Sequence, residues 1–343
     1  MNFDIKIEPR LFHFKQPAGT SRGVYTTRQS WYILFVDKDN AEHIGIGECA
    51  PLPDLSCDAS PHYEAQLNQF ANQFMEADEI GWGALRDYPS MLFGFETAWQ
   101  HYQSKSLKLW DTPFARGEKG ITINGLIWMG EYDEMRKQIE TKMELGFRCI
   151  KLKIGAIDFE KEMDLLTYIR SCFTPEQIEL RVDANGAFGL TDTLDKLTRL
   201  SALGLHSIEQ PIRAGQWKEM AKLTAVTPLP IALDEELIGV NTLIEKQHLL
   251  DTIKPQYIIL KPSLHGGIRG SKEWIDEAEK RNIKWWITSA LESNIGLNAI
   301  AQWTATLNPI LPQGLGTGML FTDNVELPLD IKGDELWFTE SKC

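Results

Sequence analysis

The feature that most constrains the fold is an alternation of strand-like and helix-like segments that begins near Gly120. Short apolar segments recur at intervals of roughly 25–30 residues, and helix formers fill the stretches between them. The expected strands are 121–127, 148–154, 179–183, 207–210, 231–234, 257–261, 284–288 and 311–316. An open nucleotide-binding sheet would need a G-x-G-x-x-G turn after its first strand, and Gly125 and Gly130 do not form one. The pattern therefore predicts a TIM-like barrel over residues 116–320.

Residues 1–115 lack this alternation. Three strand-like stretches come first (3–14, 30–37 and 42–48), and two helical stretches follow at about 60–78 and 89–105. Strands followed by helices predict a separate α+β domain that ends near residue 115. After the eighth expected strand the chain is too short for another helix, and it reads as a hairpin around Gly333. We expect 321–343 to return to the first domain.

Composition and charge indicate which binding partners and which cellular compartment to expect. The net charge is −13 and no basic patch stands out, which argues against nucleic acid or an anionic membrane as a partner. No stretch approaches about 18 apolar residues, and the first residues lack the pattern of a signal peptide. The five cysteines are scattered and odd in number, which favours reduced thiols and a cytoplasmic protein. The oligomeric state stays open.

Three of the expected barrel strands end in an acid, where a buried strand would stay apolar. Asp183 ends the third strand, Glu209 the fourth and Asp234 the fifth. Each alone could be a helix cap or a loop acid, but together they meet at the barrel mouth where TIM-barrel enzymes carry out their chemistry. Three carboxylates this close repel one another unless a cation joins them. Oxygen ligands without His or Cys predict Mg²⁺, with Mn²⁺ or Ca²⁺ as substitutes.

Lysines stand on both sides of this predicted metal site. Lys151 and Lys153 share one face of the second strand, and Lys261 ends the sixth. Two lysines on one strand face would alone indicate a solvated face, but the neighbouring carboxylates favour a catalytic role. Burial and nearby cations lower the pKa of a lysine, so that a general base becomes possible near neutral pH. Lysines flanking a metal predict proton abstraction next to a carboxylate, with the metal neutralising the enediolate.

As an ordered set, these motifs resemble the enolase superfamily, muconate-lactonizing subgroup, over nearly the whole chain. The motifs are Lys151-x-Lys153, Asp183-x-Asn185-Gly186, Glu209-Gln210-Pro211, Asp234-Glu235 and Lys261-Pro262. The resemblance implies an α+β capping domain over a modified TIM barrel, (β/α)7β. It also implies that Lys153 is the base, that Lys261 is a cation on the opposite face, and that Lys151 assists Lys153 and polarises the bound carboxylate. The residues expected to support these groups are Arg181, Asn185, Glu235 and Glu292.

Within the subgroup the chain most resembles the o-succinylbenzoate synthases of menaquinone biosynthesis, which are lyases. Dipeptide epimerases are similar to one another in an Asp-x-Asp on the eighth strand, whereas this chain has Gly-Leu-Gly-Thr-Gly at 314–318. The expected ligand is a small-molecule carboxylate. An N-succinylamino acid racemase or another epimerase of the superfamily stays open, and so does a barrel that binds without turnover.

The expected substrate contacts come from the barrel mouth and from a lid. They are Ser289, the backbone of Gly314 and Gly316, and Thr20 and Arg22. The small, polar segment 17–23 and the proline-stiffened loop 49–56 are expected to close over the mouth and exclude water. His265 and the tryptophans, Trp286 included, are interpreted as structural. Glu235 would point away from the site if its strand were still regular there.

Overall fold

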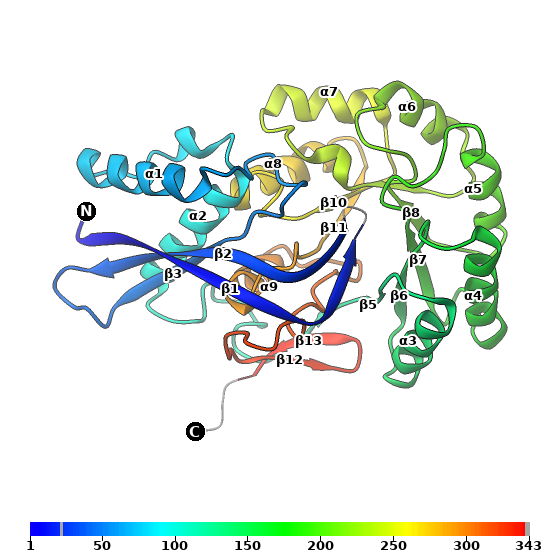
Figure 1. Ribbon diagram of the computed structural model, residues 1–343, viewed down its shortest axis with the longest axis horizontal. Helices are drawn as coiled ribbons and strands as arrows, with labels where there is room; N and C mark the ends of the chain where they lie inside the picture. Colours follow the sequence, from blue (N-terminus) through cyan, green and yellow to red (C-terminus); the bar gives the residue numbers. More distant parts are fainter. Residues whose placement is uncertain (21–22, 340–343) are drawn as a thin grey trace.

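The computed structural model describes residues 1–20 and 23–339. Its N-terminal part (residues 3–104) is a three-stranded antiparallel sheet with two helices packed against it (Figure 1). The elements are β1 (Phe3–Thr20), β2 (Gly23–Asp37), β3 (Ile44–Cys49), α1 (Tyr63–Ala77), the 3-10 helix η1 (Trp82–Leu85) and α2 (Pro89–Ser104). This arrangement confirms the predicted α+β character.

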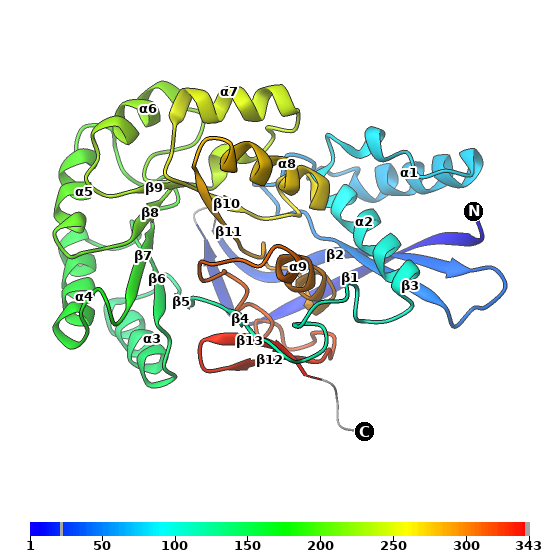
Figure 2. The ribbon, with the colours of Figure 1, turned by 180° about the vertical axis from the view of Figure 1, so that it is seen from behind.

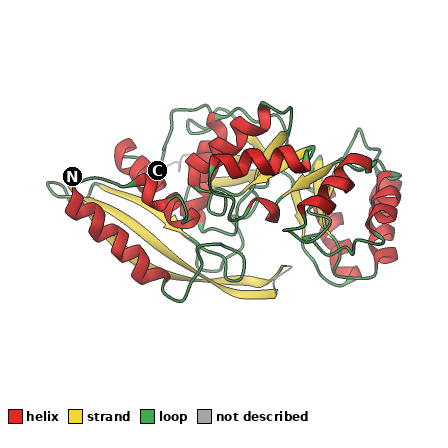
Figure 3. Cartoon of the chain, turned by 90° about the horizontal axis from the view of Figure 1, so that it is seen from above, coloured by secondary structure: helices red, strands yellow, loops and turns green. Residues whose placement is uncertain are grey.

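β1 and β2 extend farther than the sequence suggested. The segment 17–23 was expected to be a loop, but β1 continues to Thr20, which pairs with Gly23 at the start of β2. Pro17 falls in an irregular stretch of the ladder, where a residue without an N–H is tolerated. Residues 21 and 22 lie outside the described chain. The resulting long hairpin reaches from the N-terminal part toward the barrel (Figure 3).

Helix α2 lies very close to β3, because glycines remove the side chains between them. A Cβ atom on Gly47 would lie 2.0 Å from the carbonyl oxygen of Gly94, and one on Gly45 would lie 2.3 Å from that of Ala98. In the other direction, a Cβ atom on Gly94 would lie 2.2 Å from Cys49 Sγ. These separations leave no room for any side chain. α2 and β3 therefore form one rigid unit.

The rest of the chain confirms the predicted barrel, with seven parallel strands in chain order and helices on the outside (Figures 1 and 2). The strands are β5 (Gly125–Ile127), β6 (Cys149–Lys153), β7 (Glu179–Asp183), β8 (Ser207–Glu209), β9 (Ile231–Leu233), β10 (Tyr257–Leu260) and β11 (Lys284–Ile287). The helices are α3 (Tyr132–Glu144), α4 (Phe159–Cys172), α5 (Thr193–Ser201), α6 (Trp217–Val226), the 3-10 helix η2 (Glu235–Leu237), α7 (Leu243–Ile253), α8 (Gly267–Glu279) and α9 (Asn294–Thr306). Within the described residues, no helix is both long and apolar enough to cross a membrane.

The eighth barrel strand, expected at 311–316, is reduced to two bridges. Gln313 pairs with Ile123, and Gly314 pairs with Thr288 just beyond β11. These bridges join the two edges of the seven-stranded sheet and close the ring. The strand is shorter than expected because its proline and glycines pair poorly with neighbouring strands.

The C-terminal hairpin differs from the expectation in its partner. β12 (Leu329–Lys332) and β13 (Glu335–Phe338) turn at Gly333 as predicted, but β13 pairs with β4 (Ile121–Thr122). The expected return of this hairpin to the first domain is therefore wrong. The predicted strand 121–127 is broken into β4 and β5, and β4 offers a free edge to β13. The preceding segment does reach the N-terminal part, where Phe321 pairs with Phe14.

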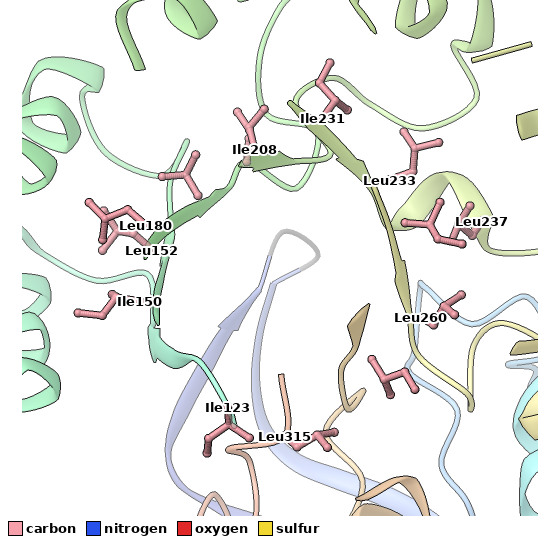
Figure 4. Close-up of a cluster of buried hydrophobic side chains, with 14 of the residues drawn as sticks. Ile123, Ile150, Leu152, Leu180, Ile208, Ile231, Leu233, Leu237, Leu260 and Leu315 are labelled. Carbon is pink, nitrogen blue, oxygen red and sulfur yellow. The ribbon is translucent and has the colours of Figure 1, made fainter. Parts of the chain in front are cut away.

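The largest hydrophobic cluster surrounds the barrel strands. Figure 4 shows apolar side chains from successive strands arranged around the ring. Ile150 and Leu152 belong to this cluster, whereas Lys151 and Lys153 between and beyond them point to the other face of β6. Apolar burial on the outer face thus holds the strands in register and leaves the inner face free for polar side chains.

An apolar interface joins the N-terminal part to the barrel. Apolar side chains from both sides form one buried cluster, in which Phe12, Tyr32 and Leu52 meet Leu264 and Leu291. At its edge the buried guanidinium of Arg28 donates to carbonyl oxygens of both parts. These oxygens belong to Ala50, Pro51, Ala290 and Leu291.

Gly47→Ala tests the close packing of α2 on β3. We expect a loss of stability of about 1–3 kcal/mol or more, because the added methyl group overlaps the backbone of α2. Thermal unfolding followed by circular dichroism measures it. Gly83→Ala is the matched control, since a Cβ atom there meets nothing within 4 Å. Equal midpoints for the two variants would contradict the account of this interface.

Candidate active site

The predicted lysines and acids converge at the C-terminal ends of β6 to β10. A cavity of about 970 Å³ opens there, between the barrel mouth and the N-terminal part. Lys151, Lys153, Asp183 and Lys261 line it. The other two acids, Glu209 and Asp234, are buried beside them. A second hollow of about 520 Å³ lies around the N-terminal ends of β10 and β11 and contains none of the predicted site residues.

Lysines pair directly with the three acids. Lys151 Nζ lies 2.6 Å from Glu209 Oε2 and 2.9 Å from Asp183 Oδ2, so it stands between the two carboxylates. Lys153 Nζ lies 3.0 Å from the same oxygen of Asp183. On the other side of the mouth, Lys261 Nζ donates to Asp234 Oδ2. Buried charges in such numbers are tolerated only when each is paired.

Asn185 and Glu235 extend this network into the cavity. Asn185 Oδ1 accepts a hydrogen bond of 2.6 Å from Lys153 Nζ, and its Nδ2 donates to Glu235 Oε1 at 2.9 Å. Asn185, directly after β7, has a φ of 43°, in the left-handed region that asparagine tolerates. Glu235 lines the cavity because β9 stops at Leu233 and a 3-10 helix follows. The regular strand that would point Glu235 away is therefore absent from this position.

Burial and the neighbouring carboxylates have opposite effects on the pKa values of the lysines. Burial alone would lower the pKa of Lys151, but the charges of Asp183 and Glu209 outweigh it and raise that pKa. The pKa of Lys261 rises for the same reason, through Asp234. Both shifts are opposite to the lowering expected from burial and neighbouring cations. In this arrangement, Lys151 and Lys261 are held as ammonium groups.

The carboxylates outnumber the lysines that balance them. Burial and the charge of Asp183 raise the pKa of Glu209 well above its usual value. Burial, followed by the charge of Asp234, raises the pKa of Glu235 to about 7. Four acids thus face three amines, and a further positive charge at this place would be favourable.

The donor set fits a divalent cation. In the part of the chain that the structure describes, Glu209 Oε1, Asp234 Oδ1 and Glu235 Oε2 are buried without a hydrogen-bond partner. Buried carboxylate oxygens normally have partners, and a hard cation would supply one. No ready-made cluster of three acidic, histidine or cysteine ligands is present among residues 1–20 and 23–339, because Lys151 and Lys261 occupy the facing oxygens. A cation that used these facing oxygens would have to displace the two lysines.

The residues predicted to bind substrate fall into two groups. Ser289, Gly314 and Gly316 line the cavity, and Ser289 Oγ lies 2.6 Å from Thr317 Oγ1. Thr20 is the last residue of β1, and Arg22 lies outside the described residues. Contacts of those two residues with a substrate stay a prediction.

Two residues predicted to support the site lie behind it. Arg181 sits deeper in the barrel than Asp183: its Nε donates to Glu179 at 2.7 Å, and its guanidinium lies 4.2 Å from the centre of the Trp286 ring. Glu292 is buried and accepts hydrogen bonds from Ser263 Oγ and Ala290 N. Their role in supporting the site stays a prediction.

Sequence reasoning missed other residues at this site. Trp286, interpreted as packing, lines the cavity above Arg181. His265 is buried and accepts a hydrogen bond of 3.0 Å at Nδ1 from the backbone N–H of Lys261. Tyr25 and Leu55 line the cavity from the N-terminal part. No local pattern marks such residues, because Trp286 and His265 take their places through packing within the barrel, and Tyr25 and Leu55 through the meeting of the two parts.

Comparisons with known proteins identify the family. Residues 134–337 match the family described as enolase C-terminal domain-like, and residues 20–102 match the one described as MenC, N-terminal domain. The o-succinylbenzoate synthase of Desulfotalea psychrophila is 47% identical, over 93% of this chain and 95% of that protein. This chain belongs to the o-succinylbenzoate synthase family of the enolase superfamily.

Solved structures support the membership in this family. The crystal structure of MenC from Desulfotalea psychrophila matches with a TM-score of 0.84 and 42% identity, over 98% of this chain and all of that one. A dipeptide epimerase from Enterococcus faecalis, at 17% identity, has a TM-score of 0.83 over 99% of this chain and 97% of its own. At that identity the likeness shows the fold alone. The o-succinylbenzoate synthase family thus shares its architecture with epimerases.

Asp234→Asn tests the predicted metal site. We expect the affinity for Mg²⁺ to fall by more than about tenfold, because one anionic donor is lost while the fold stays intact. Isothermal titration with MgCl₂ measures the affinity, and circular dichroism checks the fold. Asp195→Asn, an exposed acid on α5, is the control. Unchanged Mg²⁺ affinity in Asp234→Asn would remove this residue from the site.

Proposed function

We propose that this protein is an o-succinylbenzoate synthase of menaquinone biosynthesis. As a hydro-lyase it removes water from 2-succinyl-6-hydroxy-2,4-cyclohexadiene-1-carboxylate and releases o-succinylbenzoate. The observation that carries the proposal is the set of three lysines and three acids at one barrel mouth, in a chain 47% identical to the synthase of Desulfotalea psychrophila. A protein that only bound its ligand would have no need of all six groups.

The cavity suits a substrate with two carboxylates and no amine. Its wall at the eighth strand consists of Gly314, Gly316 and the hydroxyl group of Thr317, without an acid that could hold an ammonium group. Ser289 adds a second hydroxyl group. Leu52 and Trp286 supply apolar surface for the ring and the methylene groups of the substrate.

Lys153 is the proposed base. Its amine takes the proton from the ring carbon that bears the carboxylate and then gives it to the leaving hydroxyl group on the same face. One C–H bond and one C–O bond break, a ring double bond forms, and the products are water and an aromatic ring. Asp183 and Asn185 hold the Nζ atom of Lys153 at 3.0 and 2.6 Å, so the amine is oriented before substrate arrives.

Lys261 and Lys151 stay protonated in this scheme. Lys261 faces the ring from the opposite side and offsets the negative charge of the enediolate, as a cation over a π system. Lys151 polarises the substrate carboxylate and assists Lys153. The raised pKa values of both lysines support these roles, because an ammonium group stabilises negative charge and a neutral amine does not.

Mg²⁺ is the proposed cofactor, with Mn²⁺ as a substitute. Asp183, Glu209 and Asp234 would hold it, and the unpartnered oxygens of Glu209 and Asp234 support this assignment. When bound, the cation supplies positive charge that neutralises the enediolate. Chelation would then stop turnover reversibly.

A racemase acting on N-succinylamino acids is the second candidate. The observation that favours it is that both Lys153 and Lys261 line the cavity. A racemase needs a proton-active lysine on each face of the α-carbon, whereas a syn dehydration needs only one. The dehydration is preferred because the chain is 47% identical to an o-succinylbenzoate synthase.

Three further assignments complete the proposal. The segments 17–23 and 49–56 form the lid, with Thr20 and Arg22 as substrate contacts; Tyr25 and Leu55 on the cavity wall support it. The capping domain comprises 1–115 and the barrel comprises 116–320; of the segment expected to return to the capping domain, Phe321 pairs with Phe14, whereas β13 pairs with β4. The location is cytoplasmic, which the free thiols of the described cysteines support.

A parallel assay tests the reaction. We expect the purified protein with Mg²⁺ to aromatise the cyclohexadiene, followed by ultraviolet absorbance, and to leave dipeptides unchanged. Lys153→Ala should lower kcat by about 10²–10⁴-fold, the usual contribution of a general base. Lys222→Ala, a lysine with a 72% exposed side chain on α6, is the control. Fast racemisation of N-succinylamino acids, with diene turnover no faster than in buffer, would make the racemase the correct assignment.

A further inference from the structure

Two buried glutamates of the N-terminal part accept hydrogen bonds from the N-terminal ends of two barrel helices. Glu48 lies on β3 and is fully buried, and Glu96 lies on α2 and is 8% exposed. Because glycines pack α2 tightly on β3, both carboxylates belong to one rigid unit. α2 lies beside α8 and α9, the helices that follow the last two strands of the parallel sheet (Figure 2).

Glu96 caps α8 from outside the barrel. The N-cap of α8 is Gly266, which has no side chain to satisfy the free amides of the first turn. Glu96 Oε2 accepts from Ile268 N at 2.6 Å, and Oε1 accepts from Arg269 N at 3.2 Å. These are the two amides that an N-cap side chain within the helix would normally bind. The negative charge also suits the positive end of the helix.

Glu48 completes the cap of α9, whose N-cap residue Ser293 itself accepts from Ile295 N at 3.3 Å. Its Oε2 accepts from Gly296 N at 2.9 Å and from the hydroxyl group of Ser293 at 2.6 Å, while its Oε1 accepts from Ser293 N at 3.0 Å. Ser30 Oγ donates the fourth hydrogen bond, to Oε1 at 2.8 Å. Four donors satisfy both oxygens of a carboxylate that water cannot reach.

Each capped helix has a glycine where the carboxylate approaches. A Cβ atom on Gly267 would lie 2.4 Å from Glu96 Oε2, and one on Gly296 would lie 2.9 Å from Glu48 Oε2. Both distances are shorter than a carbon–oxygen contact allows. The helices are therefore shaped to receive these two side chains.

The segments in front of both helices carry two residues of the proposed active site. The turn between β10 and α8 begins with Lys261, and the turn between β11 and α9 contains Ser289. Glu292 links the two turns, because it accepts from Ser263 Oγ in one and from Ala290 N in the other. A shift of either helix would move Lys261 or Ser289 relative to the cavity.

We propose that Glu48 and Glu96 are positioning residues of the reaction: by capping α9 and α8 from the N-terminal part, they fix Ser289 and Lys261 at the cavity. This inference rests on the roles of Lys261 and Ser289 in the proposed function. Docking of the N-terminal part thus sets the geometry of the barrel mouth as well as covering it. Displacements of about 1 Å at such a site cost up to a hundredfold in rate.

Glu96→Gln and Glu48→Gln test the proposal, because glutamine keeps the size and loses one acceptor and the charge. Glu96→Gln should lower kcat by about ten- to a hundredfold with little change in KM, since Lys261 acts on charge that develops in the transition state. Glu48→Gln should mainly raise KM, since Ser289 contacts bound substrate. Alanine at either position should have a larger effect than glutamine. The control is Glu76→Gln, an exposed acid of α1.

Hydrogen exchange gives a readout that does not depend on turnover. Peptides covering 262–269 should exchange faster in Glu96→Gln, and peptides covering 289–296 faster in Glu48→Gln, while the rest of the barrel keeps its protection. Exchange and kinetics like those of Glu76→Gln would overturn the proposal, and so would faster exchange throughout the chain. If the wild type fails to turn over the cyclohexadiene, the proposed function fails. The exchange data then still decide whether the two glutamates fix these turns.

Discussion

The pairing of lysines with carboxylates inside the barrel is the interaction on which the site depends. Lys151 lies between Asp183 and Glu209, and Lys261 pairs with Asp234. Isolated buried charges are very costly, so the strands must present acids and amines at matching heights. They can do so because the outer face of each strand is apolar and fixes the register. Apolar packing on the outer face of the strands thus allows charged side chains on their inner face.

The carboxylates of this network are not all neutralised by lysines, and this excess of negative charge favours the binding of a cation. Asp183 has a lowered pKa, despite its burial, because Lys151 and Lys153 lie beside it, whereas burial and Asp183 raise the pKa of Glu209. A site in which every charge were neutralised by side chains would have no affinity for a cation or for an anionic substrate. Here several oxygens remain buried and unsatisfied among the described residues. Such oxygens cost stability and indicate a site adapted for binding.

The sequence predicted the barrel and the residues at its mouth well, because both follow from local rules. Side chains alternate along β6, so Lys151 and Lys153 had to share a face, and acids at strand ends had to meet. The rest depended on long-range contacts. Nothing local shows that β13 pairs with β4, or that Thr20 continues a strand. Glu235 faces the cavity only because β9 is one residue shorter than its sequence suggests.

The same limit applies to the junction of the two parts. Glu48 and Glu96 read as ordinary acids in a strand and a helix, and their partners lie about 170–250 residues away along the chain. The raised pKa of the buried carboxyl of Glu96, about 7, is likewise a property of the assembled molecule. Contacts of this kind become visible only when the tertiary structure is known.

The buried position of Arg28 affects how the junction between the two parts unfolds. Its guanidinium is fully buried and donates to carbonyl oxygens of residues 50, 51, 290 and 291. Because arginine keeps its proton at any physiological pH, a loosening too small to admit water would leave the charged guanidinium with half of its acceptors gone. Neither half of the junction can loosen by small steps. The sheet of β1–β3 and the barrel should therefore lose this junction in one step.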